Sequence, residues 1–150
     1  GENSLRIFLD HESIEKAGLK LDEVKAAAKK EFEKDDNVAF VVDYDNVAAQ
    51  SIPQPIRERI INGYSRERGG DLLLVTNPGW IDASNATNYK GTTHGLWNPD
   101  DSHIPLIFMG WNIKSGETSK PTSMTDIAPT ICSMLHIQMP NACVGNSIFQ

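Results

Sequence analysis

Short apolar stretches alternate with amphipathic stretches along the first half of the chain, and this alternation limits the possible folds more than any other feature. Residues 4–10 (SLRIFLD) alternate like a half-buried strand, while 37–43 (NVAFVVD) and 72–76 (LLLVT) are typical of buried strands. Between them, residues 22–34 carry apolar side chains at helical spacing, and residues 53–64 begin with prolines that favour a first helical turn. The order strand–helix–strand–helix–strand predicts an α/β fold, a small sheet with helices on one face.

The second half has a different character. Residues 77–101 are rich in Gly, Pro, Asn and Thr, and a loop of that length in a compact domain is commonly functional. Residues 104–109 (IPLIFM) predict a short strand, and residues 125–137 (TDIAPTICSMLHI) predict a helix with one apolar face. At its start, Asp126 is expected to stabilise the helix N-terminus rather than to catalyse. The change of character predicts a boundary after residue 77.

Charge and cysteine content exclude several classes of function. The formal net charge of −6 argues against nucleic acid or an anionic membrane as the partner, because no basic patch can displace counterions. No apolar run approaches the roughly 20 residues that cross a bilayer. Two cysteines, Cys132 and Cys143, are too few for a disulfide framework. A buried free thiol at Cys132 is the simpler interpretation, and a bond between the two is the alternative.

The long loop contains residues 91–95 (GTTHG), in which Gly95 directly follows His94 and Gly91 lies three residues before it. Glycine lets the backbone turn tightly and leaves the imidazole accessible, which suits a metal ligand or a catalytic base. Taken alone the pattern is weak, since a loop histidine is more often simply exposed or hydrogen-bonded. Three tryptophans, Trp80, Trp97 and Trp111, flank this loop and either line a pocket or pack the loop.

Four motifs in a fixed order resemble the C-terminal signature of bacterial alkaline phosphatases, in the phosphodiesterase-like branch of the alkaline phosphatase superfamily. They are residues 91–95 (GTTHG), 102–110 (SHIPLIFMG), 124–130 (MTDIAPT) and 138–141 (QMPN) followed by Gly145. Residues 64–74 (YSRERGGDLLL) are also similar to a family segment, so the likeness covers nearly the whole chain. It implies part of an alkaline phosphatase-like α/β sandwich. Residues 1–77 would be an insertion-like α/β subdomain, and residues 78–150 the C-terminal part of the catalytic core.

The resemblance also implies a metal site. Enzymes of this superfamily hold two zinc ions among carboxylates and histidines, and a Thr or Ser hydroxyl attacks phosphorus to form a covalent phospho-enzyme. The histidine of the THG motif binds the zinc that activates the hydrolytic water, and this role carries over to His94. A zinc-bound imidazole needs an outer hydrogen-bond partner to orient it. Thr92, Thr93 and His103 are candidates, although a structural role is the favoured interpretation of His103.

No nucleophile is expected in this chain, because the family's nucleophile and its other metal motifs lie upstream of the matched region. The carboxylate pairs Asp43–Asp45 and Asp100–Asp101 do not match those motifs in context. A catalytic zinc needs about three protein ligands. The chain alone is therefore expected to be inactive and to retain no zinc, and its partner would be the missing N-terminal part of the catalytic domain. An apolar face left exposed where that part would dock would favour a dimer.

The resemblance thus implies the C-terminal part of a zinc-dependent phosphate monoester hydrolase that is periplasmic or secreted. Two alternatives stay open. One is a phosphodiesterase or nucleotide pyrophosphatase of the same superfamily, since the basic residues that hold the extra charge of a monoester lie upstream. The other is a non-catalytic α/β domain that binds a ligand or a partner, which predicts a His94 loop remote from any pocket.

Overall fold

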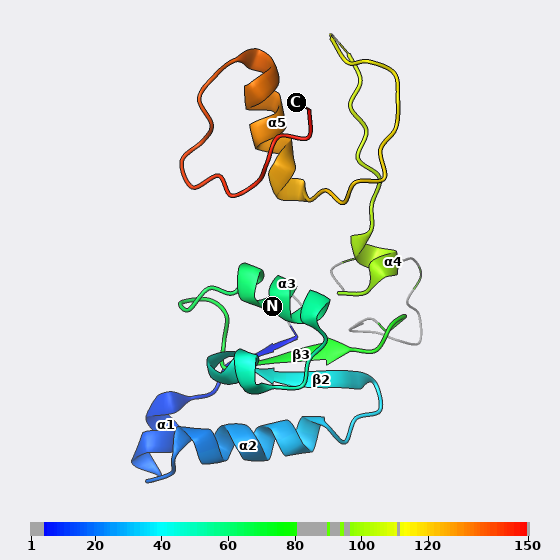
Figure 1. The fold of residues 1–150 in the computed structure, drawn as a ribbon. Coiled ribbons are helices and arrows are strands. Elements are labelled where there is room, and N and C mark those ends of the chain that lie inside the picture. Colours follow the sequence, from blue (N-terminus) through cyan, green and yellow to red (C-terminus); the bar gives the residue numbers. More distant parts are fainter. Residues whose placement is uncertain (1–4, 81–89, 91–93, 95–96, 111, 150) are drawn as a thin grey trace. The chain divides into compact units, whose positions relative to one another are not determined.

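The computed structural model of the chain describes residues 5–80, 90, 94, 97–110 and 112–149 (Figure 1). The chain divides into two units, Gly1–Pro105 and Leu106–Gln150. The first unit holds a three-stranded sheet and most of the helices, and the described residues of the second unit include a nine-residue helix. The two units are defined by contacts within this chain. The boundary predicted after residue 77 is of another kind, because it divides the chain into an insertion-like subdomain and a part of the catalytic core. That boundary stays a prediction.

The sheet of the first unit has the order β1-β3-β2. Its strands are β1 (Arg6–Ile7), β2 (Val38–Asp43) and β3 (Leu72–Thr76), and β1 and β2 each run antiparallel to β3. In this register Val42 lies opposite Leu73 and Val41 lies opposite Leu74. The strands predicted at 37–43 and 72–76 are confirmed to within a residue. The strand predicted at 4–10 pairs over two residues only.

The helices of this unit are α1 (His11–Lys16), α2 (Leu21–Phe32), the 3-10 helix η1 (Tyr44–Ala49), α3 (Gln54–Gly63) and the short α4 (Pro99–Ser102). Figure 1 shows α2 and α3 on opposite sides of the sheet, so the prediction of helices on one face is wrong. The reason is that the central strands are apolar on both sides. Val42 and Ile60 of α3 belong to one core cluster, which comprises Val42, Val47, Ile52, Ile60, Leu73 and Val75. The neighbour of Val42 in the strand, Val41, points to the other face of the sheet and is also buried.

A glycine pair makes the turn into β3 possible. Gly70 has a φ of +75°, and a Cβ at that position would lie 2.7 Å from the carbonyl oxygen of Ile7. The next residue, Asp71, donates its backbone N–H to that same oxygen over 2.8 Å. Gly70 therefore lets the end of β1 approach the start of β3, and a larger residue would separate the two strands.

The apolar segment 104–109 does not form the predicted strand. It has no strand assignment, and the described residues include no segment that pairs with it. Its side chains are largely in solvent, since Ile107 is 82% and Met109 is 94% exposed. A strand is stable only when its backbone groups bond to a neighbour, so the apolar composition alone was not sufficient to make one.

The second unit is built around α5 (Ile127–Leu135), preceded by the 3-10 turn η2 (Met124–Asp126). This confirms the helix predicted at 125–137, which ends two residues early because His136 adopts a left-handed conformation with φ 53°. Cys132 of this helix is buried, and neither it nor Cys143 forms a disulfide, in agreement with the simpler interpretation of the two thiols.

Asp126 joins the start of α5 to the C-terminal segment. Its Oδ2 accepts the N–H of Ser123 over 2.9 Å, and its Oδ1 accepts the N–H of Asn146 over 2.8 Å. These backbone hydrogen bonds, that of Asn146 first, hold the pKa of Asp126 below its ordinary value. A Cβ on Gly145 would collide with the Thr125 carbonyl, so only glycine allows this approach. These contacts give Asp126 the structural role at the helix start that was predicted for it. Through Asp126 and Gly145, the C-terminal segment is fixed to the start of α5.

Candidate functional site

His94 is one of two residues that the structure describes between positions 81 and 96, the other being Lys90. The His94 residue is exposed. Thr92 and Thr93, the predicted outer partners of its imidazole, lie outside the described residues. The role of His94 as a zinc ligand, and of the two threonines as its support, therefore stays a prediction.

The chain that leaves the His94 loop is fixed to the first unit. The indole of Trp97 is half-buried and packs against the core cluster, which favours a packing role for this tryptophan. Nη1 of Arg59, on α3, donates to the carbonyl oxygen of Trp97 over 2.7 Å and to Oγ of Ser102 over 2.6 Å. The segment 97–102 is thus held at both ends by one guanidinium group.

His103 ends the short helix α4. Its backbone N–H donates to the carbonyl oxygen of Pro99 over 2.8 Å, and the residue itself is exposed. The backbone contact gives His103 a structural role at the end of the helix. His103 was also a candidate hydrogen-bond partner for the imidazole of His94. The backbone contact does not test that role, which stays a prediction.

The carboxylates of Asp43 and Asp45 face a buried lysine rather than a vacant metal site. Lys25 of α2 is 3% exposed, and its Nζ donates to Oδ1 of Asp43 over 3.1 Å and to Oδ2 of Asp45. Asp43 also accepts a hydrogen bond from the side chain of Asn46 over 2.8 Å. Burial alone would raise the pKa of Asp43, but the hydrogen bonds from Asn46 and Lys25 outweigh burial and lower that pKa.

No three histidine, cysteine or acidic residues gather closely enough to hold a metal ion within the part of the chain that the structure describes. The Asp43–Asp45 pair forms ion pairs with the ammonium of Lys25. That this pair is not a family metal motif stays a prediction. His94 can serve as one ligand. It does not by itself fit a catalytic zinc, which takes about three protein ligands.

A second histidine has a carboxylate partner that the sequence did not reveal. Nε2 of His11 lies 2.7 Å from Oδ1 of Asp71, whose Oδ2 accepts the N–H of Leu9 over 2.8 Å. The two partners are 60 residues apart, so no local spacing could indicate the pair. The His11–Asp71 contact connects α1 to the start of β3, which is a structural role.

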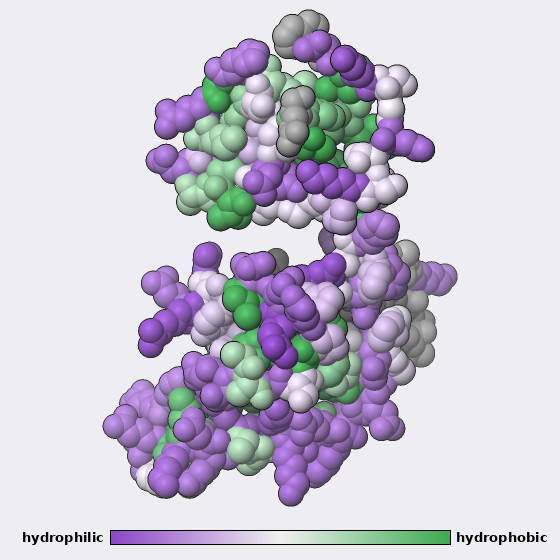
Figure 2. All heavy atoms as spheres, viewed as in Figure 1, coloured by the Kyte–Doolittle hydropathy of each residue, from purple (hydrophilic) through white to green (hydrophobic). Residues whose placement is uncertain are grey.

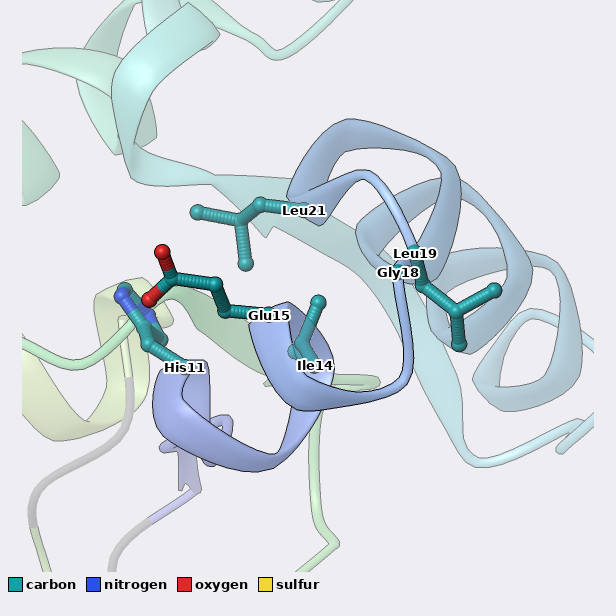
Figure 3. A pocket seen from close by; sticks show the side chains of 6 residues that line it. All are labelled: His11, Ile14, Glu15, Gly18, Leu19 and Leu21. Carbon is teal, nitrogen blue, oxygen red and sulfur yellow. The ribbon is translucent and has the colours of Figure 1, made fainter.

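His11 also borders a cleft of about 330 Å³ between α1 and α2 (Figure 3). In that view the carboxylate of Glu15 points toward the imidazole of His11. The remaining lining is apolar or glycine and comprises Ile14, Gly18, Leu19 and Leu21. None of these lining residues carries a hydroxyl or a thiol, and the titratable side chains of the lining are His11 and Glu15.

Known proteins similar to this chain include two alkaline phosphatases and a protein with a different name. Over 143 residues, 95% of the chain, it is 49% identical to the "Calcium-transporting ATPase" of Myroides odoratus. Over the same share it is 43% identical to alkaline phosphatase PafA of Elizabethkingia meningoseptica and 41% identical to alkaline phosphatase PhoV of Synechococcus elongatus. No protein-family model matches the chain.

The fold agrees with the sequence. The crystal structure of wild-type alkaline phosphatase PafA superposes on 96% of this chain with a TM-score of 0.89 and 43% identity. The chain spans about a quarter of the relatives' length, 26% for PafA and 25% for PhoV. Likeness of this extent in both sequence and backbone is not explained by a shared α/β class alone. The chain belongs to the alkaline phosphatase superfamily and corresponds to a segment of its much longer members.

Proposed function

We propose that the chain is the C-terminal part of a zinc-dependent phosphate monoester hydrolase, an alkaline phosphatase that acts through a covalent phospho-Thr or phospho-Ser intermediate. The observation that carries this proposal is the likeness to PafA, at 43% identity over 95% of the chain. The chain covers 26% of PafA, so the nucleophile and the other metal ligands would come from the rest of the catalytic domain. Residues 78–150 would belong to the catalytic core, and residues 1–77 would form an insertion-like subdomain.

His94 is the residue of this chain that we assign to the metal site. Two zinc ions in the full-length enzyme would neutralise negative charge on the phosphoryl group and lower the pKa of bound water. His94 would contribute one ring nitrogen as a ligand, and its other nitrogen would be oriented by a neighbouring group such as Thr92, Thr93 or His103. Support comes from the GTTHG motif at residues 91–95 and from the exposure of His94.

The chain on its own should bind zinc weakly and hydrolyse no phosphate ester. One imidazole supplies a third of the protein ligands that a catalytic zinc takes, about three. Zinc affinity would be measured by competition with a chromophoric chelator, and turnover with nitrophenyl phosphate. His94→Ala in the same chain is the matched control and should leave the weak affinity nearly unchanged. Stoichiometric binding with a submicromolar dissociation constant would contradict the prediction.

The full-length protein should prefer a phosphate monoester to a diester. A site with groups for the extra negative charge loses those contacts with a diester, and kcat/KM should fall about 100-fold. The comparison is between nitrophenyl phosphate and bis(nitrophenyl) phosphate. ATP belongs in the same series, because one relative is named an ATPase. Higher kcat/KM for the diester or for ATP would favour the phosphodiesterase or nucleotide pyrophosphatase alternative.

The partner that we propose is the remainder of the catalytic domain. Figure 2 shows apolar side chains at the surface of the second unit, where Ile131 is 43%, Leu135 is 55% and Val144 is 80% exposed. Dimerisation of the chain alone through such a face is the alternative. The proposed location is the periplasm or the cell exterior, as in the resemblance. None of the described helices is long and apolar enough to cross a membrane.

A further inference from the structure

We propose that Gln50 takes the place of a neighbouring strand at the outer edge of β2 and prevents that edge from pairing with a second copy of the chain. β2 is an outer strand of the sheet that the described residues form, because the order is β1-β3-β2 (Figure 1). The outer edge of a strand presents N–H and C=O groups that can pair with another chain. All the contacts involved lie in the first unit and are independent of the proposed function of His94.

The hydrogen-bond pattern shows which groups of β2 face outward. In an antiparallel pair, successive residues of a strand bond alternately to the neighbouring strand and away from it. Tyr44, directly after β2, donates its N–H to the carbonyl oxygen of Asp71 over 3.2 Å, so the preceding residue, Asp43, faces outward. Val41, two residues earlier, has the same orientation. Its partner in the register, Leu74, agrees with this, because the N–H of Leu74 bonds toward β1 and away from β2.

The side-chain amide of Gln50 bonds to both outward groups of Asp43. Its Oε1 accepts the N–H of Asp43 over 3.2 Å, and its Nε2 donates to the carbonyl oxygen of Asp43 over 2.9 Å. A residue of a neighbouring antiparallel strand makes the same two bonds with its backbone. One side chain thus satisfies the last residue of β2 and prevents another strand from bonding there.

Helices on both faces of the sheet hold Gln50 in this position. From α2, Nζ of Lys29 donates to Oε1 of Gln50 over 3.0 Å. From α3, Nη2 of Arg57 donates to the carbonyl oxygens of Gln50 and Ile52 over 3.1 and 2.9 Å. Ile52 itself is 5% exposed and belongs to the core cluster. The segment 50–52 is therefore fixed at the edge by polar contacts at one end and by burial at the other.

This segment covers the edge of β2 incompletely. A cleft of about 190 Å³ is lined by Ala39, Phe40 and Val41 of the strand and by Gln50, Ser51 and Ile52 of the covering segment. Among the described residues, the hydrogen bonds between the segment and the backbone of β2 are the two that Gln50 makes with Asp43. Gln50 is therefore the residue on which the protection of the edge depends.

A second copy of the chain is the partner that fits the outward-facing groups. If two β2 strands pair antiparallel about a two-fold axis at Val42, Val41 of each copy lies opposite Asp43 of the other, and both pairs are of the hydrogen-bonded kind. Each pair includes an Asp43, so the contacts of Gln50 block both. The run VAFVV at residues 38–42 favours such pairing, because it has high β-propensity and no charge.

The test replaces glutamines in the 150-residue chain. Gln50→Ala removes both hydrogen bonds to Asp43. Gln50→Asn keeps the amide but shortens the side chain by one methylene group, which draws the amide away from the edge. Gln54→Ala is the matched control, because Gln54 donates to Glu58 over 3.0 Å on the exposed surface of α3.

Self-association is measured by sedimentation over a series of concentrations, together with hydrogen exchange at the amides of Val41, Val42 and Asp43. In dilute Gln50→Ala the Asp43 amide should exchange about 10-fold faster than in the wild type, because it loses its acceptor. At high concentration Val41 and Asp43 should gain protection together, and the dissociation constant of the dimer should be about 10-fold lower than for the wild type. The amide of Val42 faces β3 and should not change with concentration. Gln50→Asn should show smaller changes of the same kind, and Gln54→Ala should match the wild type.

Association that is equally strong in the wild type, Gln50→Ala and Gln54→Ala overturns the proposal. Stronger association of Gln50→Ala without protection of Val41 and Asp43 overturns it as well, because the copies would then meet at another surface, such as the apolar face of the second unit. If circular dichroism shows that Gln50→Ala does not fold, Gln50→Asn decides the question by the same two criteria.

Discussion

His94→Ala in the full-length protein should lower kcat/KM for a phosphate monoester on the order of 10³-fold and should reduce the bound zinc. Removal of a group that merely orients a metal ligand already costs 10- to 100-fold, so removal of the ligand itself should cost more, about 10³-fold. The measurements are kcat/KM with nitrophenyl phosphate and zinc content after dialysis. Excess zinc should restore part of the activity, because the other ligands would remain.

The control for this experiment is a histidine with a structural partner. His11 is bonded to Asp71 and lies in α1, and His11→Ala should change kcat/KM less than about twofold. His103→Ala is the more demanding comparison, because His103 lies near the loop and its backbone contact would survive the change. If His94→Ala kept the zinc content and the activity of the wild type, the assignment of His94 as a metal ligand would be wrong. A non-catalytic α/β domain would then be the favoured interpretation of the chain.

Local patterns predicted most elements of the first unit. The β-branched run at 37–43 and the proline pair before α3 carry their structural preference in the residues themselves. The layer order was predicted wrongly, although a local pattern indicates it. The sequence pattern favoured helices on one face of the sheet, yet Val41 and Val42, adjacent in β2, are buried at 3% and 0% exposure. A continuous apolar run buries both faces, and that feature predicts helices on both sides.

The segment 104–109 shows the limit of such patterns. Its apolar composition is that of a buried strand. A strand also needs a neighbouring strand to accept and donate its backbone hydrogen bonds, and the composition of one segment does not indicate whether that neighbour is present. Among the described residues Leu106 is 39% and Ile107 is 82% exposed, so the segment has the composition of a strand without its environment. Whether such a run pairs depends on chain that lies elsewhere in the sequence or in another part of a longer protein.

Individual residues also differ in whether a local pattern marks them. His94 was found from a motif that lies within five consecutive residues. Arg59 was not found, because its partners are 38 and 43 residues distant and no helical spacing marks it. Lys25 was missed for a related reason. The spacing of Val24 and Ala28 fixes the apolar face of α2, and a lysine next to that face is normally expected in solvent.

Replacing Lys25 by methionine should lower the free energy of unfolding of this chain by about 3 kcal/mol. Methionine keeps most of the apolar stem but leaves Asp43 without its buried cation. The loss should fall at the low end of the range for a broken buried pair, because Asp43 keeps its bonds from Asn46 and from the Asp45 N–H. Urea unfolding followed by circular dichroism gives the value. Lys16→Met, at an exposed pair with Glu12, is the control and should change it by less than about 0.5 kcal/mol.

The pH dependence of that difference tests its electrostatic origin. Burial opposes the charge of Lys25, but its hydrogen bonds to Asp45 and Asp43 raise the pKa of Lys25 above the ordinary 10.5, whereas the pKa of Asp43 is held below 3.8. Because the folded-state pKa of Asp43 is lowered, its contribution is complete above that ordinary value and is lost as the pH falls through the folded value. The contribution of Lys25 is complete below 10.5 and is lost as the pH rises through its raised pKa. The difference between wild type and Lys25→Met should therefore be constant from about pH 5 to pH 9 and should shrink in acid, where Asp43 becomes neutral and needs no cation. A difference that stayed the same down to pH 2 would assign the effect to packing of the lysine stem instead of to the buried charges.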